Sequence, residues 1–151
     1  MEFTDIAMEL SREAWQASFN HPFVLQLQEG TLEPSIFRYY LIQDAYYLKS
    51  FSEAYHLLAD KTSNEEMKRL LKQNAQSLVE GELFIRQQFF KELGISDQEM
   101  EQHPIAPTCY HYISHIYRQF AEPNLGIAFA SLLPCPWLYH DLGKALNRKP
   151  S

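Results

Sequence analysis

The stretch from Phe37 to Leu58 constrains the fold more than any other part of the chain. Read at the helical repeat of about 3.6 residues, one stripe along it consists of core-type side chains with a single exception, Asp44. The stripe comprises Phe37, Leu41, Asp44, Leu48, Phe51, Tyr55 and Leu58. An apolar stripe of this length predicts a long helix that packs against other helices.

Asp44 is the unusual member of that stripe, because a carboxylate on an apolar face loses its hydration unless another group pairs with it. Tyr40 and Tyr47 lie about one helical turn to either side of Asp44, so two phenols and a carboxylate share one face. This arrangement suits a flat aromatic ligand that stacks on rings and offers N–H groups to an acceptor. It also suits a structural Asp that neighbouring tyrosines hydrogen-bond, and the helix alone favours this second interpretation.

The rest of the chain also has helical patterns, without an internal repeat, a Gly-rich phosphate loop or a segment of strand period. Helices are predicted over residues 4–19, 23–27, 32–62, 63–93, a short piece from 96, 108–120 and 124–146. Pro134 and Pro136 remove two backbone donors and predict a kink in the middle of the last helix. We therefore predict an all-α bundle that forms one domain over residues 1–151.

Composition narrows the possible partners. Hydrophobic residues make up 46% of the chain and aromatic residues 14%, which is typical of a folded globular protein. The net charge of −6 disfavours nucleic acid or an anionic membrane as a partner. The N-terminus lacks the basic start and apolar run of a signal peptide, and no stretch is long enough to span a bilayer. Two cysteines make no disulfide framework, so a reduced, cytoplasmic location is predicted.

Two further residues are candidates for chemistry. Cys135 lies between the two prolines, where an open backbone turn can present a nucleophilic thiol; a small buried thiol beside a kink is the alternative. Glu82 interrupts the apolar line Met67, Leu71, Asn74 or Ala75, Leu78, Glu82, Ile85, Phe89 and Leu93. Asp44, Glu82 and Cys135 come from three predicted helices, which favours a pocket that all three share.

A metal site is the main competing chemistry, since helical bundles can hold di-metal centres with Glu-x-x-His pairs. Glu53-x-x-His56 has that spacing, but Glu53 points away from the Asp44 stripe. His111 and His115 are four residues apart, without an evident third ligand on their helix. We therefore predict neither a metal nor a cofactor.

Several motifs, in order along the chain, resemble those of thiaminase II, the TenA family. They are His21-Pro-Phe23, Gly30-Thr-Leu32, Phe37-x-Tyr-Tyr-x-x-Gln-Asp-x-Tyr-Tyr-Leu48, Tyr112-x-x-His-x-Tyr117 and Leu132-Leu-Pro-Cys-x-Trp-Leu-Tyr139. The resemblance implies a haem-oxygenase-like helical bundle, usually assembled as a tetramer. It also implies hydrolysis of 4-amino-5-aminomethyl-2-methylpyrimidine to hydroxymethylpyrimidine and ammonia, and cleavage of thiamin, in thiamin salvage.

The resemblance assigns roles to individual residues of this chain. It implies that Cys135 is the nucleophile that adds to the pyrimidine ring. Asp44 would pair with the ring nitrogen and the exocyclic amine, whose amidine-like edge matches the two carboxylate oxygens. Tyr47, Tyr112 and Tyr139 would line the pocket, with Tyr40 behind them. The resemblance does not settle the role of Glu82, which we predict to be a buried carboxylate that supports the site or the structure.

Family members continue beyond the position of Ser151, through helices that supply a pocket Tyr and a Glu acting as general acid. General acid–base help is typically worth about 10²–10⁴ in rate, so reduced activity is expected of this shorter chain. The apolar faces that those helices would cover predict that the chain pairs with a second copy, in a homo-oligomer or a swapped bundle. The alternatives are a catalytically inactive oligomeric protein that at most binds a pyrimidine, and a haem or di-metal protein on the same bundle.

Overall fold

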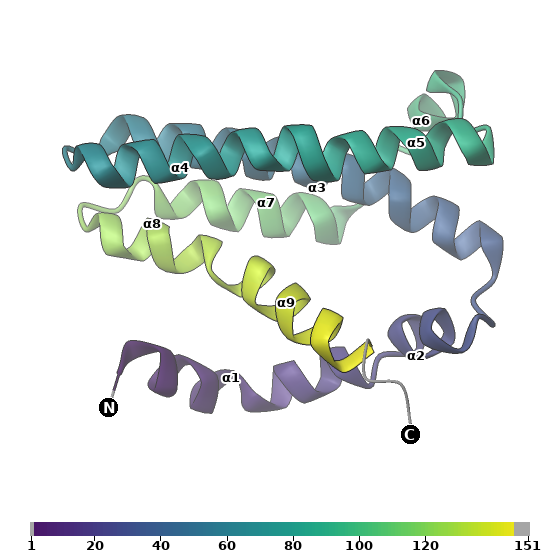
Figure 1. Cartoon of the computed structure of the whole chain (residues 1–151), viewed down its shortest axis with the longest axis horizontal. Coiled ribbons are helices and arrows are strands. Elements are labelled where there is room, and N and C mark those ends of the chain that lie inside the picture. Colours follow the sequence, from purple (N-terminus) through teal and green to yellow (C-terminus); the bar gives the residue numbers. More distant parts are fainter. Residues whose placement is uncertain (1, 147–151) are drawn as a thin grey trace. The chain divides into compact units, whose positions relative to one another are not determined.

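The structure is a computed structural model that describes residues 2–146, all of whose regular elements are helices (Figure 1). The chain divides into two compact units, residues 34–133 and the pair of segments 1–33 and 134–151, which are described separately below. The predicted all-α class is confirmed. The organisation of residues 1–151 as one domain stays a prediction.

The smaller unit contains three helices: α1 (Phe3–Phe19), α2 (Pro22–Glu29) and α9 (Pro134–Leu146). α1 ends before His21-Pro22, because the residue that precedes a proline is disfavoured in the helical region. The His21 ring then caps α2 by accepting a hydrogen bond from the Phe23 backbone N–H, 3.2 Å away. The Trp15 ring of α1 packs edge-to-face on the Trp137 ring of α9, with centroids 5.5 Å apart.

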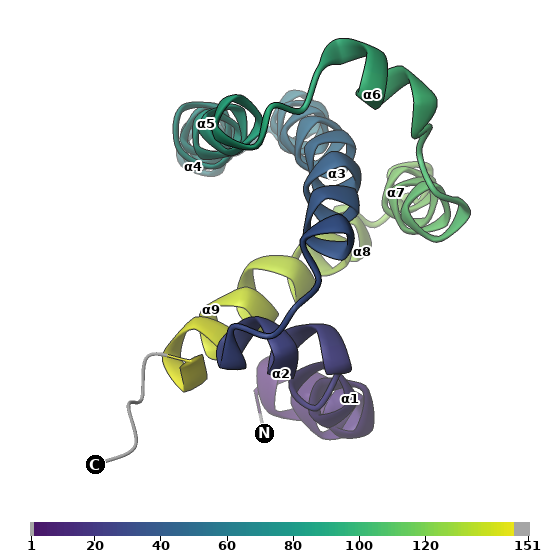
Figure 2. The same ribbon diagram turned by 90° about the vertical axis from the view of Figure 1, so that its right-hand side faces the viewer.

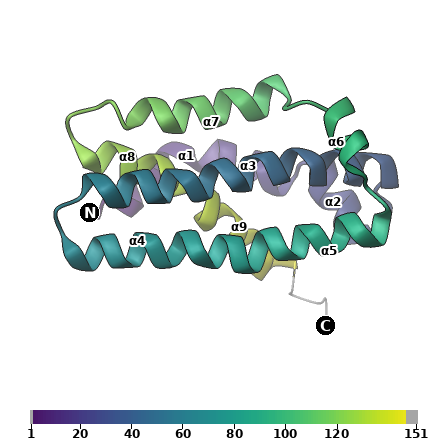
Figure 3. The same ribbon diagram turned by 90° about the horizontal axis from the view of Figure 1, so that it is seen from above.

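The larger unit is built around α3 (Pro34–Lys61), the long helix that the apolar stripe predicted. Within this unit, α3 lies between the α4–α5 rod on one side and α7 on the other (Figure 2; Figure 3). Its other elements are α4 (Glu65–Ser77), η1 (Leu78–Leu83), α5 (Phe84–Leu93), α6 (Asp97–Gln102), α7 (Pro107–Gln119) and α8 (Leu125–Leu132).

The stripe of α3 supplies the core of this unit. Its buried members are Leu41, Asp44, Leu48, Phe51 and Leu58. Small residues let α3 and α4 approach closely: Ala54, Ala59 and Ala75 are fully buried, and the Ser52 hydroxyl donates to the Ala75 carbonyl at 3.2 Å. The sequence therefore predicted the inward face of α3 correctly, including the burial of its one carboxylate.

The rod opposite α3 differs from the prediction in register. The sequence pattern predicts one continuous helix over 63–93, whereas a π-helical segment, η1, separates α4 from α5. A π turn contains an extra residue, so the side chains that follow it are rotated relative to a regular α-helix. As a result Glu82 and Ile85 are exposed, and Arg86 points inward. Glu82 is thus not the buried carboxylate that the stripe predicted.

Two helix boundaries also differ. The segment 124–146 was predicted as one kinked helix, but α8 ends at Leu132 and α9 begins at Pro134. The helix predicted over 108–120 is α7, which begins one residue earlier, at Pro107, with Ala106 as its N-cap. Both differences place a proline at the first helical position, where its missing N–H has no helical partner to lose.

Candidate functional site

The candidate site is centred on the Asp44 carboxylate, in the middle of α3. The residue is 8% exposed, and Arg86 Nε donates to its Oδ2 in an ion pair between α3 and α5. Burial raises the pKa of the Asp44 carboxyl above its ordinary value; the charge and hydrogen bond of Arg86 act in the opposite direction, and the nearby charge of Glu82 adds to the rise. Asp44 is therefore a desolvated acid whose charge depends on its one bonded cation.

Arg86 was missed by the sequence analysis. Its side chain is 16% exposed, and its guanidinium carbon lies 5.8 Å from the centroid of the Tyr40 ring. Tyr40 thus supports the cation that pairs with Asp44, through a cation–π contact. A buried carboxylate calls for a cationic partner, which is the signal that could have found Arg86. The regular helical period hid it, because that period places Ile85 and not Arg86 on the inward face.

An aromatic stack lies next to Asp44 along α3. Tyr47 stacks on Phe51 with centroids 5.3 Å apart, and on Tyr112 of α7 with centroids 5.7 Å apart. The interplanar angles are 23° and 19°, so the rings are close to parallel. The structure therefore brings together three predicted site residues, Asp44, Tyr47 and Tyr112, in one unit.

Hydrogen bonds at both ends of α7 hold Tyr112 against Tyr47. At the start of the helix, the buried Gln43 amide donates to the Pro104 carbonyl at 3.1 Å and accepts from the Ala106 backbone N–H at 2.7 Å. Near its end, the Tyr117 hydroxyl donates to the Ser50 carbonyl at 3.0 Å. Gln43 is the neighbour of Asp44 in the chain, so the residue beside the carboxylate also fixes the helix that carries the aromatic partner.

Cys109 is a half-buried thiol close to the same carboxylate. Its Sγ donates to the Gln43 carbonyl at 3.7 Å. Burial raises the pKa of the Cys109 thiol, and the Asp44 charge raises it further. A thiol in this environment stays protonated, so Cys109 is poorly suited to be a nucleophile.

Cys135 and Tyr139 lie one turn apart near the start of α9, in the smaller unit. Cys135 is half-buried and not in a disulfide, and Tyr139 is exposed. Their participation in a pocket with Asp44 stays a prediction.

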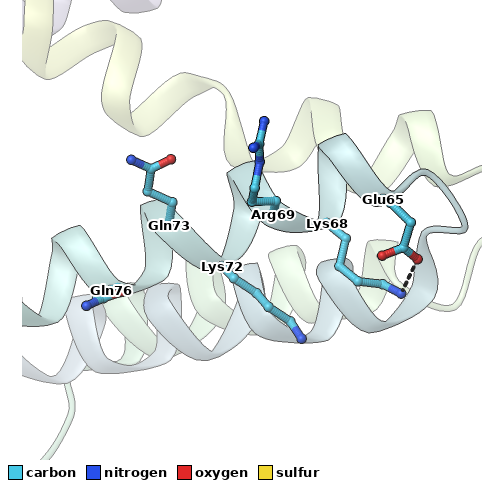
Figure 4. A pocket seen from close by; sticks show the side chains of 6 residues that line it. All are labelled: Glu65, Lys68, Arg69, Lys72, Gln73 and Gln76. Atoms are coloured by element: carbon cyan, nitrogen blue, oxygen red, sulfur yellow. Dashed lines mark hydrogen bonds and ion pairs between the residues drawn. The ribbon is translucent and has the colours of Figure 1, made fainter.

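A separate surface hollow lies along α4 and is lined by Glu65, Lys68, Arg69, Lys72, Gln73 and Gln76 (Figure 4). All six side chains come from one helix, and Lys68 pairs with Glu65 at 3.0 Å. The lining has neither an aromatic ring nor a buried carboxylate, so it lacks the groups that a pyrimidine would require.

The two metal-ligand pairs in the sequence do not form a cluster. Over residues 2–146, no group of three or more His, Cys, Asp or Glu side chains is arranged to hold a metal ion. Glu53 instead accepts a hydrogen bond from the Tyr117 hydroxyl at 3.4 Å.

Among the described residues, 2–146, no helix combines the length and the apolar character that crossing a bilayer requires.

Comparison with known protein families gives a match over nearly the whole chain. The model of the TENA/THI-4/PQQC family matches residues 10–151. The chain belongs to this family. The resemblance that the sequence motifs carried is thereby confirmed.

The curated relatives of this chain include two proteins that both carry the name aminopyrimidine aminohydrolase. Aminopyrimidine aminohydrolase of Bacillus subtilis (strain 168) is 35% identical over 146 residues, which are 97% of this chain and 62% of the relative. Aminopyrimidine aminohydrolase of Halalkalibacterium halodurans is 29% identical over 150 residues, which are 99% of this chain and 67% of the relative. The chain thus spans about three fifths of the length of the Bacillus subtilis protein.

Solved structures confirm the TenA-like helical fold. A TenA family transcription regulator from Silicibacter sp. TM1040 superimposes with a TM-score of 0.88 at 26% identity, covering 96% of this chain and 64% of that one. A TenA homologue from P. horikoshii OT3 gives the same TM-score and identity, covering 98% of this chain and 69% of that one.

Proposed function

We propose that this family member hydrolyses 4-amino-5-aminomethyl-2-methylpyrimidine to hydroxymethylpyrimidine and ammonia, and cleaves thiamin, as a salvage reaction. The observation that carries the proposal is the buried Asp44 carboxylate next to the Tyr47–Tyr112 stack. A carboxylate accepts N–H donors from the edge of an aminopyrimidine, while the aromatic rings contact its face. The similarity to two aminopyrimidine aminohydrolases names the class of substrate.

In this proposal, Asp44 binds the polar edge of the ring and Cys135 is the nucleophile that adds to it. The bond to the exocyclic aminomethyl nitrogen then breaks, and ammonia leaves with a proton that comes from water. The hydroxyl of that water adds to the exocyclic carbon, and the bond between Cys135 and the ring breaks, which restores the thiolate and the aromatic ring. Tyr47, Tyr112 and Tyr139 line the pocket, and Tyr40 and Arg86 support Asp44. Glu82 is near enough for its charge to act on Asp44, but its exposed position makes it a peripheral residue.

Regulation of transcription, the activity in the name of the Silicibacter protein, has less support from this chain. The net charge of −6 opposes the binding of nucleic acid, whose phosphates attract positively charged surfaces.

The decisive test combines a titration with a turnover assay on one sample. We expect hydroxymethylpyrimidine to bind by isothermal titration calorimetry, and the aminomethylpyrimidine to release ammonia in a coupled assay. Binding should disappear in Asp44→Ala, because the acceptor for the ring edge is removed. Binding without turnover would support the alternative of an inactive pyrimidine-binding protein. The absence of both binding and turnover would contradict the proposal.

We also propose that the protein is a homo-oligomer. Five large apolar side chains on α4, η1 and α5 are exposed: Leu70, Val79, Phe84, Ile85 and Leu93. Full burial of an exposed apolar side chain contributes about 1.5–3 kcal/mol, and because these side chains are already about half buried, covering the rest of each contributes about half of that. Sedimentation velocity at micromolar concentration should therefore show a species larger than the monomer. A single monomeric boundary would contradict this prediction.

A further inference from the structure

The aromatic stack of the candidate site joins rings from two different helices. Tyr47 and Phe51 are one turn apart on α3, so the geometry of a single helix fixes their relation. Tyr112 belongs to α7, and its ring stacks on Tyr47 with centroids 5.7 Å apart. The contacts that hold α7 to α3 therefore decide where the Tyr112 ring lies at the site.

Gln43 makes three hydrogen bonds to the start of α7. Its side-chain Nε2 donates to the Pro104 carbonyl at 3.1 Å, and its Oε1 accepts from the Ala106 backbone N–H at 2.7 Å. Its backbone carbonyl accepts from the Cys109 thiol at 3.7 Å. The residue is 8% exposed, and a buried amide that lost these partners would be left unsatisfied. A primary amide suits this position because it presents a donor and an acceptor at the same end of the side chain.

The segment that Gln43 holds leads directly into α7. Ala106 is the N-cap of the helix, and Pro107 is its first residue. Pro104 and Pro107 restrict the backbone on either side of the bonded Ala106 N–H, because a proline ring fixes φ. The two bonds of the Gln43 amide therefore act on a stiff segment, and they fix the point at which the helix begins.

The other end of α7 is held separately, because the Tyr117 hydroxyl donates to the Ser50 carbonyl at 3.0 Å. Tyr112 lies between the two attachments, about two turns from the start of the helix. Without the bonds of Gln43, α7 would stay attached at Tyr117 and its start would be able to pivot about that end. Such a movement would shift the Tyr112 ring relative to α3.

We propose that Gln43 is a positioning residue of the pyrimidine site: its amide fixes the start of α7 and thereby places the Tyr112 ring against the ligand. This inference rests on the proposed function, because it takes Tyr112 as a ring that contacts the pyrimidine. It deepens that function by giving two neighbouring residues of α3 different tasks. Asp44 faces Arg86 of α5 and binds the ring edge, whereas Gln43 faces the segment before α7 and sets the aromatic contact.

The substitution Gln43→Glu separates the hydrogen bonds of the amide from its shape. A protonated carboxyl has an O–H donor and a carbonyl acceptor, so it can make both bonds of the amide. A carboxylate has acceptors alone, and it would face the Pro104 carbonyl without a donor. Burial and the neighbouring charge of Asp44 raise the pKa of a carboxyl at this position, which brings its titration toward neutral pH.

The first test is calorimetric titration with hydroxymethylpyrimidine between about pH 5 and about pH 9, a range above the ordinary pKa of Glu. The affinity of Gln43→Glu is divided by that of the unmodified protein at the same pH. We expect this relative affinity to approach one at the acidic end and to fall at least about tenfold toward the alkaline end. Gln43→Met keeps the length of the side chain without the amide, so its relative affinity should be at least about tenfold lower throughout. A constant ratio for Gln43→Glu, or an unchanged affinity of Gln43→Met, would overturn the proposal.

The same titratable groups surround residue 43 in the variant and in the unmodified protein. They are Asp44, Tyr46 and Tyr47 on α3, Arg86 on α5, His103 after α6 and Cys109 on α7. Because the two affinities are compared at each pH, the titration of these groups cancels from the ratio. The remaining dependence on pH belongs to the introduced carboxyl.

Alkylation of the Cys109 thiol is a measurement without ligand, and it separates failure of this inference from failure of the proposed function. In a Cys135→Ser background Cys109 is the one cysteine of the chain, and its Sγ bonds the Gln43 carbonyl from the first turn of α7. If Gln43→Met releases the start of α7, iodoacetamide should modify this half-buried thiol at least about tenfold faster, as followed by mass spectrometry. Acceleration in a protein that binds no pyrimidine would support the hold of Gln43 on α7 and refute the proposed function. An unchanged alkylation rate would refute the role of Gln43.

Tyr46→Phe is the matched control. The Tyr46 hydroxyl on α3 donates to the Met100 carbonyl of α6 at 3.2 Å, a bond of the same kind that does not reach α7. Its loss should lower stability and leave both the pyrimidine affinity and the alkylation rate of Cys109 within about threefold of the unmodified protein. Equal effects of Tyr46→Phe and Gln43→Met would indicate a general loosening of the unit, and would overturn the specific role of Gln43.

Discussion

Replacing Cys135 with serine should lower the rate of ammonia release from the aminomethylpyrimidine by at least about a thousandfold, because loss of a nucleophile removes the covalent route as a whole. A serine hydroxyl has nearly the shape of the thiol but is a far weaker nucleophile without an adjacent base. Binding of hydroxymethylpyrimidine should change little, since the ring edge is recognised by Asp44. The expected signature is therefore a loss of turnover with retained affinity, measured by the coupled assay and by calorimetry.

Cys109→Ser is the control that the chain itself offers. The Cys109 thiol donates to a backbone carbonyl, which a serine hydroxyl can also do, and its raised pKa disfavours the thiolate. Turnover should therefore stay within about threefold of the unmodified protein, as for a substitution that preserves a local hydrogen bond. If Cys109→Ser removed the activity and Cys135→Ser did not, the nucleophile would be assigned to the wrong helix.

The inward face of α3 could be predicted because one physical rule governs it. A regular helix with a 3.6-residue repeat places Leu41, Asp44, Leu48 and Phe51 on one side, and burial of apolar area keeps that side inward. The carboxylate was visible for the same reason, as the exception within an apolar line. The family was visible because whole motifs, and not single residues, were retained along the chain.

The partner of Asp44 could not be predicted in the same way. Its position depends on the π turn over Leu78–Leu83, whose extra residue rotates everything that follows it. No residue type in Leu-Val-Glu-Gly-Glu-Leu demands such a turn, so the regular period was assumed. That period placed Glu82 inside and left Arg86 outside. The roles of Gln43 and Tyr117 were hidden for a related reason: each bonds a backbone group more than 50 residues away, and such a contact leaves no local pattern.

Phe51→Ala should have the largest effect on stability, lowering the free energy of unfolding by about 3–5 kcal/mol. Phe51 is 3% exposed, stacks on Tyr47, and packs edge-to-face on Tyr55 with centroids 5.1 Å apart. The substitution removes the ring on which Tyr47 rests and leaves a cavity in the core. Chemical denaturation followed by circular dichroism would measure the loss, which is a large part of the 5–15 kcal/mol typical of a folded domain.

Leu57→Ala provides the matched control, because Leu57 lies on the same helix and is 42% exposed. Its loss should cost no more than about 1 kcal/mol, since little apolar area leaves the core. Phe51→Leu should recover part of the loss by refilling the cavity, without restoring the ring stack. Pyrimidine affinity can then be compared between Phe51→Leu and the unmodified protein. If Phe51→Leu lowers the affinity by more than its lower stability accounts for, the stack orients Tyr47 for binding. Equal costs for Phe51→Ala and Leu57→Ala would contradict the placement of this face of α3 in the core.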